Sequence, residues 1–245
     1  MIPGRLWRPD VILFEICGRN EAHPIYQQFE AANGARQYDF LRTLVEACLA
    51  TGKPFLSAHI VKALNFQAIT CLHTNAGEYR PCQVHVGNPA DPTTLYVPPA
   101  DYLVDSYMDD FVNTANREWE KADPLTLGAY VLWRLNHIHP FINGNGRTAR
   151  AASYFVICLK LNGWLPGSTI LPELLRQNRN EYVTVLKAVD ASYNAGALDL
   201  APLRGLIERL LMQQVSSATA TGGAASPPAP LAASALLLPI PSNTP

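Results

Sequence analysis

The chain has 245 residues, which is long enough for one large domain with appendages and for a substantial hydrophobic core. Its 19 basic and 20 acidic residues give a net charge of −1, which disfavours nucleic-acid binding as the main function because such proteins carry a positive field. The longest uncharged apolar run, residues 151–159, is far too short to cross a bilayer, so we expect no membrane-spanning segment.

The absence of a signal-peptide pattern and the cysteine spacing favour a cytoplasmic protein. The N-terminal residues lack the apolar core of a signal peptide. The five cysteines are an odd number and include no C-x-x-C pair, so the sequence indicates neither a disulfide framework nor a zinc knuckle.

Helical periodicity dominates the first third of the chain. Apolar residues spaced three and four apart predict two amphipathic helices between about residues 25 and 51, with a break near Asn33 and Gly34. A further helix is expected from Ser57, which can cap it, to about Cys71.

The pattern changes at residues 77–87, where turn residues flank a short alternating segment. Residues 95–97, just before Pro98 and Pro99, form a candidate partner strand. We therefore expect a β-hairpin within an otherwise helical protein.

The helical pattern resumes at Asp101, and Asp123-Pro124 marks a second helix start that should run to about His137. After a break, a helix from about residue 147 to 161 is followed by two more, near residues 178–192 and 202–214. The last residues are rich in alanine and proline and contain no charge or aromatic ring, so we expect a disordered tail.

The break between helices carries the most informative residues of the sequence, HPFINGNGRTAR at positions 139–150. Gly144 and Gly146 permit a tight turn whose N–H groups can point inward, and the next helix adds a positive N-terminus. Arg147 and Arg150 are three residues apart, so both can reach the oxygens of one anion. The pattern predicts a binding site for a polyphosphate such as a nucleotide.

His139 opens this segment and is a candidate general base, because an imidazole can take a proton near neutral pH. Phe141 is expected to anchor the loop in the core. A dinucleotide-binding turn is excluded because a helix precedes the glycines and no acidic residue follows at positions 164–172. A zinc site at His137 and His139 lacks a third ligand at suitable spacing.

These residues resemble the signature of the Fic family, HPFx(D/E)GNGRxxR, and match every fixed position but one. Residues 77–86 resemble the flap region of that family, and residues 179–182 its later helix. The resemblance implies a mainly α fold, a Fic-type helical bundle with a short β-hairpin flap. It divides the chain into an N-terminal helical region (1–54), a Fic domain (55–212) and a disordered Ala/Pro-rich tail (213–245).

The resemblance also implies an activity: a protein adenylyltransferase that uses ATP with Mg²⁺ and moves AMP to a Ser, Thr or Tyr hydroxyl of a target protein. It assigns His139 as the general base for that hydroxyl. The flap would hold the target backbone by strand addition. The remaining assigned positions are Gly144, Asn145 and Gly146 around the phosphates, Arg147 and Arg150 on the triphosphate, and Gln83, Val84, His85 and Val86 in the flap.

The one departure from the signature is Asn143, where the family usually has the acidic residue that contacts the metal. A neutral amide oxygen should hold Mg²⁺ more weakly than a carboxylate does. The inhibitory motif [S/T]xxxE(G/N) of many Fic proteins is not found, because no glutamate is followed by Gly or Asn. A separate antitoxin-like inhibitor, an unrestrained enzyme and another restraining device all stay open.

Two other functions stay open at this point. A Fic-fold enzyme can use another phosphate-containing donor, since a phosphate loop does not name the base of its nucleotide. A nucleotide-binding regulatory module with little turnover is the non-enzymatic alternative, and the presence of His139 argues against it because binding alone needs no base.

Overall fold

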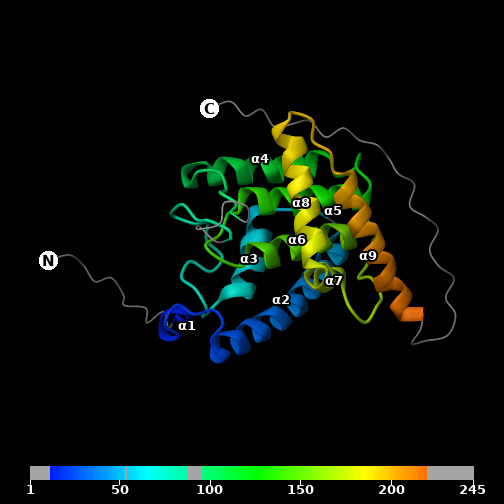
Figure 1. Ribbon diagram of the computed structural model, residues 1–245. Helices are drawn as coiled ribbons and strands as arrows, with labels where there is room; N and C mark the ends of the chain where they lie inside the picture. The colour runs from blue at the N-terminus through cyan, green and yellow to red at the C-terminus, as the bar shows by residue number, and fades with distance from the viewer. Residues whose placement is uncertain (1–11, 53, 88–94, 220–245) are drawn as a thin grey trace.

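The computed structural model describes residues 12–52, 54–87 and 95–219. The described part of the chain is mainly α-helical (Figure 1). Its elements are α1 (Leu13–Ile16), α2 (Pro24–Thr51), α3 (Ala58–Ile69), the 3₁₀ turn η1 (Asp101–Leu103), α4 (Val104–Arg117), α5 (Pro124–Ile138), α6 (Asn145–Lys160), α7 (Leu171–Gln177), α8 (Arg179–Asn194) and α9 (Ala201–Thr219).

Two antiparallel neighbours, α5 and α6, form the centre of the bundle, and most of their residues are buried on every side. Helices α2 and α3 pack against α6, while α4 and α9 pack against α5 (Figure 1). Two helices buried on most of their surface form the core of a bundle. Among the described residues, no helix is long and apolar enough to span a bilayer. The loop at residues 139–144, which joins the two central helices, is therefore held by the best-packed part of the molecule.

Local capping explains the helix starts that the sequence predicts. The Ser57 hydroxyl accepts from the Ile60 N–H at 3.2 Å and begins α3. The Asp123 carboxylate accepts from the N–H groups of Leu125 and Thr126 at 3.0 and 3.2 Å and begins α5. Each cap satisfies donors that a helix N-terminus otherwise leaves free, so both predicted starts are confirmed.

The break predicted near Asn33 and Gly34 is wrong, since α2 runs without interruption from Pro24 to Thr51. The Asn33 side chain is buried and donates to the carbonyl oxygens of Ala68 and Thr70, at 3.4 and 2.9 Å, where α3 ends. This tertiary bonding outweighs the low helix propensity of the Asn-Gly pair. The short helices α1 and α7 were not predicted either.

The last helix is longer than expected and overlaps the predicted tail. Helix α9 extends to Thr219, past the expected end at Gln214. The Gln214 amide is buried and donates to the Tyr154 hydroxyl at 2.6 Å, so contacts with α6 hold this part of the helix in place. The predicted disordered tail beyond residue 219 lies outside the described residues.

The predicted β-hairpin flap is reduced, in the part of the chain that the structure describes, to one antiparallel pair, Val86 and Tyr96. Their backbones exchange hydrogen bonds of 3.0 and 2.8 Å. The neighbouring carbonyls are occupied by side chains: Arg80 donates to those of Cys82 and Pro99, and Gln83 to that of Pro98. Carbonyls bonded in this way are less available to a strand ladder, and proline offers no N–H to it.

Candidate functional site

A cavity of about 1000 Å³ lies at the N-terminal end of α6, beside α2. The motif residues predicted to bind the nucleotide, the metal or the target hydroxyl all line it, so the fold brings them to one space. Of the predicted flap residues, His85 and Val86 reach the cavity wall, whereas Gln83 and Val84 do not. The loop residues on the wall are His139, Asn143, Gly144, Asn145, Gly146, Arg147 and Arg150.

The loop keeps its shape through contacts made below the cavity. Asn145 is buried, and its side chain accepts from the Phe141 N–H at 2.9 Å and donates to the Phe141 carbonyl at 2.8 Å. Phe141 is fully buried and packs on Tyr79, with ring centroids 5.7 Å apart. The expected anchoring by Phe141 is confirmed. The Asn145 side chain stabilises the loop, because both of its polar atoms are bonded to the Phe141 backbone and not turned to a ligand.

Gly144 sits where the loop approaches α3 most closely. Its backbone is left-handed, with φ of 75°, and a Cβ there would lie 2.5 Å from Ile69 Cγ2. The Asn65 side chain donates to the Asn143 carbonyl at 3.0 Å and fixes the preceding residue. Only glycine satisfies both the conformation and the space at position 144.

The N-terminus of α6 has the features of an anion site. Gly144 is its N-cap and offers no side chain to the free N–H groups of the first turn. Those groups carry the positive end of a 16-residue helix dipole, and the residues that bear them line the cavity. An anion in the cavity would satisfy them.

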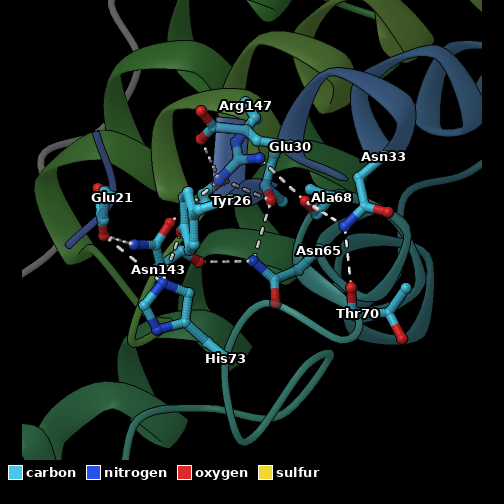
Figure 2. Close-up of polar contacts among 12 residues, drawn as sticks. Glu21, Tyr26, Glu30, Asn33, Asn65, Ala68, Thr70, His73, Asn143 and Arg147 are labelled. Carbon is cyan, nitrogen blue, oxygen red and sulfur yellow. Dashed lines mark hydrogen bonds and ion pairs between the residues drawn. The ribbon is translucent and has the colours of Figure 1, made fainter. Parts of the chain in front are cut away.

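The two arginines of the motif differ in their partners. Arg147 donates to the Ala68 carbonyl at 2.9 Å and to Asn143 Oδ1 at 3.1 Å, and it forms an ion pair with Glu30 at 3.2 Å (Figure 2). Arg150 lines the cavity, and its buried Nε has no hydrogen-bond partner among the described residues. A buried N–H without a hydrogen-bond partner is costly, so the half-buried Arg150 side chain is the better placed of the two to receive an anion.

His139 ends α5 in a left-handed conformation, with φ of 52°. The Arg80 side chain donates to its carbonyl at 2.9 Å, and the Arg80 backbone N–H donates to the next carbonyl, that of Pro140, at 2.8 Å. Burial is the main reason that the pKa of His139 falls to about 4; a backbone hydrogen bond to Asn136 raises the pKa, and the nearby Arg80 charge lowers it. The imidazole is therefore neutral at pH 7 and can accept a proton.

Asn143 presents its amide to two charged neighbours. Its Nδ2 donates to Glu21 Oε1 at 2.8 Å, while its Oδ1 accepts from Arg147 (Figure 2). The oxygen expected to face a metal is thus turned toward a cation. Within the described residues, no group of three His, Cys, Asp or Glu side chains has metal-site geometry.

Several residues of the cavity wall were missed by sequence reasoning. Glu21, Glu30, Tyr38, Arg176 and Arg179 lie on elements distant in the chain from the loop. No spacing pattern links them to the motif, because α2 with the turn before it, α7 and α8 meet the loop only after folding. Arg80 is different: it belongs to the segment that resembles the flap, so its place was indicated although its bonds to the loop were not.

Comparison with known proteins agrees with this geometry. Residues 55–157 match the model of the Fic/DOC family. A protein named "Protein adenylyltransferase Fic" from Drosophila persimilis is 34% identical over 113 residues, which are 45% of this chain and 19% of that protein. This chain therefore spans about a fifth of the length of the curated relatives it matches.

Two crystal structures show the same fold at low sequence identity. A Fic domain containing signaling protein from Bacteroides thetaiotaomicron aligns with a TM-score of 0.60 and 19% identity, over 78% of this chain and 71% of that one. A Fic family protein from Desulfovibrio desulfuricans aligns with a TM-score of 0.55 and 17% identity, over 92% of this chain and 79% of that one.

Proposed function

Because this chain is a member of the Fic/DOC family, we propose that it is a protein adenylyltransferase, which transfers AMP from ATP to a Ser, Thr or Tyr hydroxyl of a target protein. The observation that carries the proposal is one cavity that combines an anion site with a neutral base. The uncapped α6 N-terminus and Arg150, whose Nε has no hydrogen-bond partner among the described residues, make the anion site, and His139 is the base.

In the proposed reaction, His139 takes the proton of the target hydroxyl as its oxygen attacks the α-phosphorus of ATP. A new oxygen–phosphorus bond forms, the bond to the β-phosphate oxygen breaks, and pyrophosphate leaves. The first-turn N–H groups of α6 and the Arg150 guanidinium stabilise the negative charge that develops. Arg147 contributes once phosphate oxygens replace its ion pair with Glu30.

Magnesium in this reaction would neutralise phosphate charge and orient the leaving group. The residues near Asn143 supply oxygen ligands of the kind Mg²⁺ prefers, the amide of Asn143 and the carboxylate of Glu21. Both residues line the same cavity as the anion site.

The target backbone would pair with the segment at residues 83–86, which borders the cavity at His85 and Val86. The Val86–Tyr96 pair orders one side of this segment. Strand addition to the other side would hold an acceptor hydroxyl near His139 and supply the orientation that in-line attack needs.

Labelled nucleotides test the proposed function. We expect incubation with a cell lysate to place label on protein from α-labelled ATP and none from γ-labelled ATP. The His139→Ala variant should lose at least about a hundredfold in rate, the usual contribution of a general base. His59→Ala, which removes an exposed histidine of α3, is the control and should transfer normally.

Label from the γ-position alone would contradict AMP transfer. Mass spectrometry of the modified target checks the donor, since an adduct other than AMP would show that the loop binds another phosphate-containing group.

A further inference from the structure

The neutral residue at position 143 is accompanied by a carboxylate from a different part of the chain. Glu21 lies in the turn before α2 and accepts from Asn143 Nδ2 at 2.8 Å, across 122 positions of sequence (Figure 2). Both side chains line the cavity that holds the anion site. The turn therefore places a negative charge where the motif itself has none.

The position of Glu21 is fixed by packing of the N-terminal segment. Leu13, Cys17, Tyr26 and Leu72 form a small buried cluster. The backbone N–H groups of Leu13 and Phe14 donate to the carbonyls of Cys71 and Leu72 at 2.9 and 3.1 Å. These contacts tie the segment to the end of α3, so Glu21 approaches the loop as part of the fold.

The spacing of the two side chains suits a divalent cation. Oxygen ligands about 2.1 Å from an octahedral Mg²⁺ are about 3 Å from their nearest neighbours in the shell. The Glu21 oxygen and the terminal amide atom of Asn143 are 2.8 Å apart. Rotation of the amide exchanges its nitrogen and oxygen and presents two oxygens at this spacing. The rotation gives up the hydrogen bond from Arg147 to Oδ1, and Arg147 keeps its partners Ala68 and Glu30.

The charge of Glu21 also calls for a cation. Among the described residues it forms no ion pair with lysine or arginine, and Arg147, which contacts the same amide, pairs with Glu30. Its one basic neighbour is His73, with Nε2 at 3.5 Å, and this nitrogen already shares a hydrogen bond of 2.8 Å with the Tyr26 hydroxyl. A carboxylate beside bound phosphates would repel them unless a metal ion lay between.

We infer that Glu21, together with the Asn143 amide oxygen, holds the Mg²⁺ that accompanies the nucleotide. A carboxylate from the N-terminal segment thereby supplies the charge that position 143 lacks. The inference rests on the proposed nucleotide site. It concerns metal binding and does not require that AMP be transferred.

Calorimetric titration with α,β-methylene-ATP, whose α–β bridge resists cleavage, tests this assignment. The measured quantity is the ratio of the Kd in EDTA to the Kd at saturating Mg²⁺. In the wild type Mg²⁺ should tighten binding. Glu21→Gln should lower the ratio about tenfold or more, because it removes the charge but keeps an oxygen for Asn143. The double variant Glu21→Gln/Asn143→Asp should restore the ratio, because it returns a carboxylate to the same place.

The control is Glu15→Gln, a carboxylate whose side chain is 53% exposed, as is that of Glu21, but which pairs with Arg19 at 3.0 Å. Its ratio should equal that of the wild type. The assignment is overturned if Mg²⁺ does not tighten binding, if Glu21→Gln weakens binding equally with and without Mg²⁺, if the double variant stays weak, or if the analogue does not bind. Normal Mg²⁺-dependent binding without transfer of label would contradict the proposed activity alone.

Discussion

At the scale of single residues, the ionisation of His139 governs what the site can do. Burial lowers its pKa to about 4, whereas a histidine in the unfolded chain titrates near 6.5. The folded protein therefore binds fewer protons between these values. The contribution of His139 to the free energy of unfolding is complete above pH 6.5 and is lost as the pH falls toward 4.

We predict that the imidazole of His139 stays neutral down to about pH 5 in the free protein. A proton NMR titration measures this directly, with the His139 resonance assigned by its absence in the His139→Ala variant. A midpoint near 4 agrees with the buried environment. A midpoint at or above 6.5 would show that the ring is solvated, and the account of its basicity would then be wrong.

The residues of the motif were predictable because they are contiguous, and their chemistry depends on one loop and one helix start. The two carboxylates that face the motif residues could not be predicted. Glu21 and Glu30 lie more than a hundred positions away and reach Asn143 and Arg147 only through the packing of the N-terminal segment and of α2. A pattern read along the chain carries no information about such contacts.

At the scale of elements, the loop between α5 and α6 depends on a close approach to α3. We predict that Gly144→Ala lowers the free energy of unfolding by about 2–4 kcal/mol, because the new methyl group meets Ile69 and the left-handed backbone is strained. The same variant should weaken ATP binding. Chemical denaturation and calorimetry measure the two effects.

Gly163→Ala is the matched control, since a Cβ there meets nothing within 4 Å. It should change stability by less than about 1 kcal/mol. Equal stability of the two variants would mean that the loop does not press against α3 as described.

The helix starts were predictable for a local reason, since Ser57 and Asp123 cap residues only two or three positions ahead. The continuity of α2 was not, because the bonds of Asn33 reach the end of α3. The hairpin was overestimated for a similar reason. Arg80 donates to the carbonyl of Cys82 in the first expected segment and to that of Pro99 just after the second, a use of the guanidinium that alternating hydrophobicity does not reveal.

At the scale of the whole molecule, one buried amide joins three elements. Gln214 of α9 donates to the Tyr154 hydroxyl of α6, and its oxygen accepts from the Leu171 N–H at the start of α7 at 2.7 Å. We predict that Gln214→Ala costs about 2–4 kcal/mol of unfolding free energy, because it leaves buried polar groups without partners. Urea unfolding measures the loss.

The adjacent Gln213 is exposed on the same helix, so Gln213→Ala is the matched control and should stay within about 0.5 kcal/mol of the wild type. A similar, small effect of both variants would show that α9 is not anchored through Gln214.

The central claim is that phosphate groups occupy the cavity ahead of α6, where the buried Nε of Arg150 has no hydrogen-bond partner among the described residues. Calorimetric binding of ATP and of adenosine, to the wild type and to Arg150→Ala, tests it most directly. We predict that the wild type binds ATP far more tightly than adenosine, and that Arg150→Ala lowers the affinity for ATP about tenfold or more while leaving that for adenosine unchanged. Equal affinity for the two ligands, or full affinity for ATP in the variant, would contradict the account.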